Sequence, residues 1–180
     1  MIRADRVAGT AAGGKDGHGG MAITLSNSDF VPLEAFEFQH WGDRDPGRPP
    51  FDAVRPLSAD AARRVFARAS RLGSETWDDA DDALCRLDLR ADEGWSPPMV
   101  REWLLARVGA RDVPVIACFQ PTTAVVVPWG VLCDHWMQLL WTGGCVWPVE
   151  HEAWVLVHDG DQFAFGHRAS GGVETLNSEL

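Results

Sequence analysis

Two apolar runs rich in β-branched residues set the strongest constraint on the fold of this chain. Residues 113–119 read VPVIACF and residues 123–129 read TAVVVPW, and only Gln120-Pro121-Thr122 separates them. Such residues favour strands, and a short connection containing proline is typical of a turn. Because neither run alternates with polar residues, the two runs predict two central, largely buried strands of one sheet.

A second sheet element is expected at the C-terminal end, as a hairpin over about 152–167. Asp159-Gly160 lies between two apolar runs there, and Asp-Gly is the strongest local hairpin signal that a sequence offers. A two-residue loop would place four pairs on one face of the hairpin: Trp154 with Phe165, Leu156 with Phe163, Glu152 with His167, and His158 with Asp161.

Helices are expected mainly in the N-terminal half. One helix is capped by Ser58 and stopped by Gly73, and a second starts at Thr76 with Asp79 as its capping-box partner. Ser96 followed by Pro97 predicts the start of a third helix. Beyond the two central strands we expect a helix over roughly 130–141 and then a strand near Cys145–Trp147.

These elements predict an α+β fold with helices packed on a mostly antiparallel sheet of about five strands that ends in the hairpin. A chain of 180 residues is long enough for one domain with its own core, expected over 21–168. Residues 1–20 are rich in glycine and alanine and are expected to be a disordered leader, and the native start is open between Met1 and Met21. Residues 169–180 are expected to be a flexible tail.

The net charge of −10 is concentrated in one segment, which we call the acidic segment, residues 75–93. It holds eight acids and two arginines. This charge argues against nucleic-acid binding, which needs a basic surface, and favours a basic protein partner. The residues expected to contact that partner are Glu75, Asp78, Asp79, Asp81 and Asp82.

Tryptophan is the other unusual component, with nine residues in the chain. Trp41, Trp95 and Trp147 stand next to proline or glycine, where a partly exposed ring can anchor a partner. We therefore add Trp147 to the expected partner-binding residues. A tryptophan-rich surface also leaves open a purely structural or assembly role.

The cysteines and histidines predict no metal site. Cys85, Cys118, Cys133 and Cys145 form no CxxC pair, and Cys133 and His135 would point in nearly opposite directions from one helix. Helical periodicity places Cys133 in a buried stripe with Trp129 and Trp136, and Asp134 and His135 on the wetter side. No phosphate-binding loop, dinucleotide fingerprint or other cofactor motif is present, so no cofactor is expected.

The location is expected to be the cytoplasm. The N-terminus lacks the apolar block of a signal peptide, and no apolar run approaches the roughly 20 residues of a membrane span. Four cysteines in a chain of this size indicate reduced thiols. One lysine beside fifteen arginines is typical of a GC-rich bacterial coding sequence.

One catalytic alternative stays open, a small cysteine hydrolase or acyltransferase. Cys133 would be its nucleophile, His151 its base and Asp161 the acid that orients the base. Residues 151–157, HEAWVLV, resemble the histidine strand of transglutaminase-like enzymes. Against this alternative, His151 is expected on the opposite hairpin face from Asp161.

The C-terminal third also resembles a group of small uncharacterised bacterial proteins of immunity or interaction type. The residues that carry the resemblance are Asp134-His135-Trp136, Val146-Trp147-Pro148, Trp154 and Phe163-Ala164-Phe165-Gly166. The resemblance implies no catalytic residues. Together with the acidic segment it predicts a non-enzymatic module that blocks a basic partner, such as a toxin.

Overall fold

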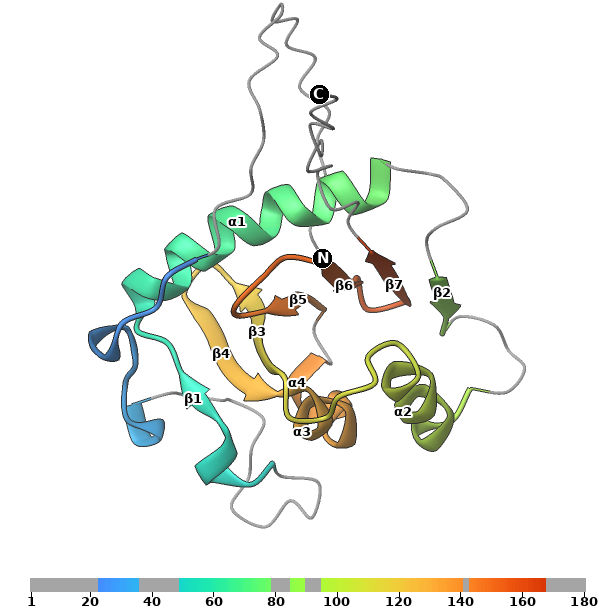
Figure 1. Cartoon of the computed structure of the whole chain (residues 1–180), viewed down its shortest axis with the longest axis horizontal. Coiled ribbons are helices and arrows are strands. Elements are labelled where there is room, and N and C mark those ends of the chain that lie inside the picture. The colour runs from blue at the N-terminus through green and yellow to red at the C-terminus, as the bar shows by residue number, and fades with distance from the viewer. Residues whose placement is uncertain (1–22, 36–48, 79–84, 90–94, 141–142, 168–180) are drawn as a thin grey trace, which may run out of the picture.

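The computed structural model describes residues 23–35, 49–78, 85–89, 95–140 and 143–167 (Figure 1). The helices are α1 (Ala59–Asp78), α2 (Pro97–Leu105), α3 (Trp129–Asp134) and α4 (Trp136–Leu140). The strands are β1 (Arg55–Pro56), β2 (Cys85–Asp88), β3 (Pro114–Gln120), β4 (Thr123–Pro128), β5 (Gly144–Pro148), β6 (Trp154–His158) and β7 (Gln162–His167). Three short 3-10 turns lie at Asn27–Asp29, Leu33–Ala35 and Phe51–Ala53.

The seven strands form one sheet in the order β1-β4-β3-β5-β6-β7-β2. Every neighbouring pair is antiparallel. β3 is central, since Ile116 lies opposite Val126 of β4 on one side and Trp147 of β5 on the other. The expected pair of central strands is therefore confirmed.

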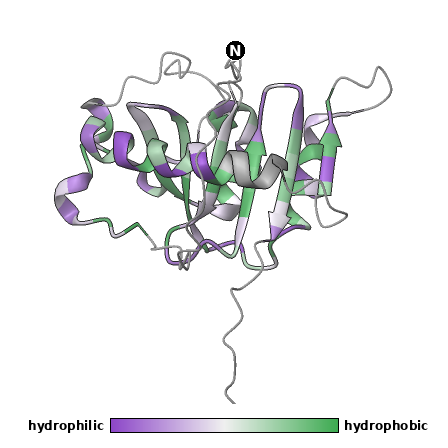
Figure 2. Ribbon diagram, turned by 90° about the horizontal axis from the view of Figure 1, so that it is seen from above, coloured by the Kyte–Doolittle hydropathy of each residue, from purple (hydrophilic) through white to green (hydrophobic). Residues whose placement is uncertain are grey.

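Successive side chains of each strand point to opposite faces of the sheet. Each face carries a buried core. The first core lies between the sheet and α2, α3 and α4; it includes Val115 and Ala117 of β3. The second lies under α1 and includes Ile116 and Cys118 of the same strand. Figure 2 shows α1 lying across strands that are largely hydrophobic, with hydrophilic residues along the helix.

The helix starts follow the local sequence closely. The Ser58 hydroxyl accepts a hydrogen bond from the Ala61 amide at 3.3 Å at the start of α1. At the start of α2, the Ser96 hydroxyl accepts from the Met99 amide at 3.4 Å, with Pro97 as the first helical residue. Both predicted caps are confirmed, because capping depends on residues within one turn.

Four expectations about the elements differ from the structure. α1 continues through Gly73 to Asp78, so Thr76 lies inside it and starts no second helix. Residues 85–88, where the sequence predicted no strand, form β2 and pair with β7, with Leu87 opposite Phe163. The described sheet has seven strands, whereas about five were expected. The sequence did not indicate β1 and β2, because these strands are too short to produce a periodic signal. Helices α3 and α4 also lie well beyond the N-terminal half.

The hairpin is present, but its register differs by two residues from the expected one. Leu156 lies opposite Phe165, and His158 lies opposite Phe163. The Asp159 carboxylate accepts hydrogen bonds from the amides of Asp161 and Gln162, both at 2.9 Å, which widens the turn beyond two residues. A two-residue shift keeps every side chain on its expected face.

Glycine is required where the α4–β5 turn passes close to the sheet. Gly143 has a φ of 87°, and an added Cβ would stand 2.8 Å from the His158 carbonyl oxygen. Gly160 has a φ of 96° with open space around it, whereas Gly109 has open space and no positive φ. A side chain would therefore meet both backbone strain and a steric clash at Gly143, backbone strain alone at Gly160, and neither at Gly109.

We expect Gly160→Ala to lower the free energy of unfolding by about 1–2 kcal/mol through backbone strain alone. Gly143→Ala should cost more, because its methyl group also meets the His158 carbonyl oxygen. Gly109→Ala should stay within about 0.5 kcal/mol of the parent. Chemical denaturation of the three variants measures this order; a Gly143→Ala variant as stable as Gly109→Ala would contradict the described turn.

Candidate functional site

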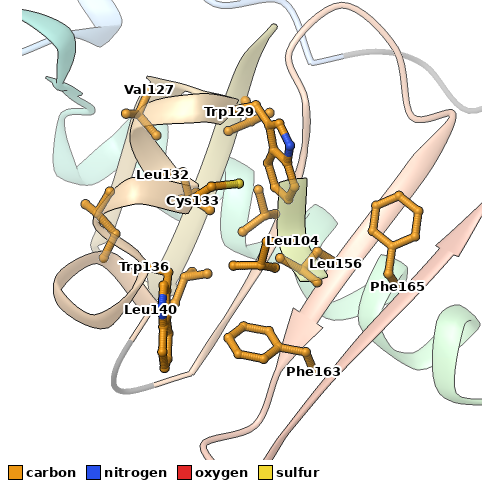
Figure 3. Close-up of a cluster of buried hydrophobic side chains, with 14 of the residues drawn as sticks. Leu104, Val127, Trp129, Leu132, Cys133, Trp136, Leu140, Leu156, Phe163 and Phe165 are labelled. Carbon is orange, nitrogen blue, oxygen red and sulfur yellow. The ribbon is translucent and has the colours of Figure 1, made fainter. Parts of the chain in front are cut away.

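Cys133, the nucleophile of the catalytic alternative, lies inside the first core. It belongs to α3 and is 0% exposed, among the large apolar side chains of Trp129, Trp136 and Leu156 (Figure 3). Burial raises the pKa of its thiol far above the ordinary value, because a thiolate would lose its hydration there. A buried neutral thiol is a poor nucleophile.

The other two members of that alternative lie on the surface. His151 is exposed in the connection between β5 and β6, and Asp161 is exposed in the β6–β7 turn. Neither has access to a sulfur that the packed core encloses. The predicted place of Cys133 in a buried helical stripe is confirmed, and the structure does not bring Cys133 together with His151 and Asp161.

All four cysteines are free, and three of them are buried. Cys118 of β3 lies directly opposite Cys145 of β5 in the second core. Burial raises the pKa of Cys118 to about 12 and also raises that of Cys145. Cys85 of β2 is exposed. In the described part of the chain, no group of three or more His, Cys, Asp or Glu side chains is placed to hold a metal ion.

Asp134 connects three parts of the structure at the end of α3. Its carboxylate accepts from Arg101 of α2 at 2.7 Å and from Arg111 at 2.6 Å. Arg111 can approach because Gly130 has no side chain: a Cβ there would stand 2.9 Å from the Arg111 Nε atom. The carboxylate is about one-third exposed, as its expected place on the wetter side of the helix implies. These ion pairs position α2 against α3 at the surface.

A second ion pair ties α1 to the β5–β6 connection. Arg68 and Glu152 form two parallel hydrogen bonds, one of them between Arg68 Nε and Glu152 Oε1 at 2.6 Å. Their side chains are only 13% and 7% exposed. A bidentate pair of this kind is directional and shielded from solvent, so it fixes α1 over the sheet.

His158 lies elsewhere than the predicted hairpin placed it. We expected an exposed cross-strand pair with Asp161, but the imidazole is 5% exposed. The wider turn places His158 opposite Phe163, and the two rings stack with centroids 4.1 Å apart. Its Nδ1 atom is 2.6 Å from the Leu140 carbonyl oxygen. Sequence reasoning missed this buried polar residue because the register of the turn decides its surroundings.

The expected anchor Trp147 is also buried. Its ring is 1% exposed in the second core, opposite Ile116, so the expectation of a partly exposed ring is wrong. Pro148 follows it at the end of β5 and is buried as well. Trp95 is half-buried and packs edge-to-face on Trp136 with ring centroids 6.2 Å apart. Trp41 lies outside the described residues.

The structure describes two parts of the acidic segment: the start of the segment, which forms the last turn of α1, and β2. Glu75 and Asp78 lie in the last part of α1, where the structure describes the backbone alone. Asp79, Asp81 and Asp82 lie outside the described residues. β2 is the last strand in the sheet order, and Asp88 on it is exposed. Figure 1 shows the end of α1 and β2 at the same end of the molecule.

No family model matches this chain, and neither the curated proteins nor the solved structures contain a match. The resemblance of the C-terminal strands to immunity-type proteins therefore stays a prediction. Among the described helices, none combines the length and the apolar character that a membrane span needs.

Thiol labelling of the folded chain tests the burial of Cys133. We expect one thiol, that of Cys85, to react rapidly at neutral pH, and the thiols of Cys118, Cys133 and Cys145 to react only after unfolding. A Cys85→Ser variant should therefore show no rapid phase. Rapid labelling of Cys133 in that variant, located by peptide mass spectrometry, would restore the catalytic alternative.

Proposed function

We propose that this chain is a non-enzymatic protein of bacterial origin that acts in the cytoplasm by binding a basic protein partner. The acidic segment provides the contact, and the mode of action is steric and electrostatic blockade, as in a toxin-immunity pair. The observation that carries the proposal is the concentration of eight acids and two arginines in residues 75–93.

The fold supports a surface role for this segment. Of its two described parts, one is the C-terminal end of α1 and the other is β2, the last strand in the sheet order. Of the strand residues, Cys85, Arg86 and Asp88 are exposed, and Leu87 is half-buried. A surface of one charge sign raises the association rate with an oppositely charged partner and disfavours partners of like charge.

The burial of the thiol supports the same conclusion. The catalytic alternative needs a reachable Cys133, and the first core encloses that residue. The four buried tryptophans Trp129, Trp136, Trp147 and Trp154 contribute to the cores and offer no ring to a partner. The acid excess of residues 75–93 therefore supports binding better than these four tryptophans do.

Charge reversal tests the acidic segment. The test variant changes four aspartates to lysine: Asp78, Asp79, Asp81 and Asp82. The control variant changes four exposed acids elsewhere to lysine: Glu34, Asp52, Asp112 and Glu150. Both variants change the net charge equally, so a difference between them reports the location of the charge.

Binding is measured against the basic products of adjacent genes by pull-down and by association kinetics at several salt concentrations. We expect the test variant to associate at least about tenfold more slowly than the parent at low salt, and the difference to shrink as salt increases. The control variant should lose much less. Equal binding by the parent and both variants would refute the proposed electrostatic contact.

A further inference from the structure

The imidazole of His158 has a defined tautomer. Its Nδ1 atom lies 2.6 Å from the Leu140 carbonyl oxygen, and a carbonyl oxygen only accepts hydrogen bonds. Nδ1 therefore carries the proton and donates it. The Nε2 atom of the neutral ring is then a bare acceptor, and it is buried with no hydrogen-bond partner in the described structure.

The bond from Nδ1 holds the end of a helix. Leu140 is the last residue of α4, and its carbonyl oxygen also accepts from the Gly143 amide at 2.9 Å. His158 is the last residue of β6 and lies opposite Gly144 of β5. One carbonyl oxygen thus connects the end of α4, the turn at Gly143 and the sheet.

We propose that His158 is a pH-sensitive latch: its neutral imidazole holds the C-terminal end of α4 on the sheet, and protonation at Nε2 releases that end. The latch concerns the stability of the fold and is independent of the proposed binding function. The physical reason is that Nε2–H of the charged ring would be a buried donor without an acceptor, next to the face of Phe163.

The charged groups around the ring do not remove this penalty. Leu140 of α4 and Phe163 of β7 contact the ring, Gly144 of β5 pairs with the His158 backbone, and none of these three residues is charged. Asp159 and Asp161, in the turn after β6, act on the ring from a distance and favour its charged form. Burial is the largest effect and lowers the pKa of His158 from 6.5; it outweighs the hydrogen bond to Leu140, which also favours the charged ring, and these two carboxylates.

The sign of the effect follows from that direction. Because the folded-state pKa of His158 is lower than the unfolded value, the unfolded chain binds this proton first as the pH falls. The contribution of His158 is fully present above pH 6.5 and is lost as the pH falls from there through the folded pKa. Within that window, each pH unit changes the folding equilibrium constant by up to about tenfold.

Nuclear magnetic resonance of the intact chain tests the latch without a substitution. Between about pH 8 and pH 4.5 we expect Nδ1 to be the protonated nitrogen of the neutral ring, and the ring to titrate below 6.5. The Gly143 amide should lose exchange protection over the same range, by a larger factor than the Ile116 amide of β3. A ring that titrates at or above 6.5, or equal losses at Gly143 and Ile116, would overturn the proposal.

A pair of substitutions separates His158 from the other titrating groups. His158→Asn keeps an N–H donor near the position of Nδ1 and does not titrate, and His151→Asn is the control at an exposed position. From about pH 7.5 to pH 5.5, the folding equilibrium constant of the parent and of His151→Asn should fall at least about threefold more than that of His158→Asn. The same fall in all three proteins would also overturn the latch.

Discussion

The structure depends on the burial of β3 on both of its faces. Val115 and Ala117 point into the core under α2, α3 and α4, and Ile116 and Cys118 point into the core under α1. Removing a valine or isoleucine side chain from water contributes about 1.5–3 kcal/mol, and a strand with one wet face would lose half of this gain. The helices must therefore cover both faces, and β4 and β5 must flank β3 so that its backbone groups are paired.

This packing also decides where function can be located. The large side chains that fill the first core, including Trp129, Trp136 and Phe163, enclose Cys133, and this burial raises the pKa of its thiol. Ion pairs between arginines and carboxylates position the helices, both at the shielded pair of Arg68 with Glu152 and at the more exposed pair of Arg101 with Asp134. Residues 75–93 carry an excess of acids in the sequence, and this excess is the basis of the proposed binding function.

Features that depend on neighbouring residues were predictable from the sequence. The Ser96 cap needs only the Met99 amide three residues away, and the two central strands need only continuous β-branched runs. The helix expected over 130–141 is present as α3 and α4, which are separated at His135, where a φ of −122° and ψ of 29° depart from helical values.

Features that depend on distant pairing were not predictable. Leu87 joins the first core only because β2 finds β7 across more than seventy residues of chain. The surroundings of His158 depend on two hydrogen bonds to the Asp159 carboxylate, which no pattern in the apolar runs encodes. Trp147 stands beside a proline, but the coverage of its face by α1 decides its exposure.

The central claim, that β3 is paired on both sides and covered on both faces, is tested most directly by long-range nuclear Overhauser contacts in the folded chain. The account predicts contacts from Ile116 to both Val126 and Trp147, and from the Ile116 side chain to buried side chains of α1. Contacts from Ile116 to only one neighbouring strand, or none to α1, would contradict it.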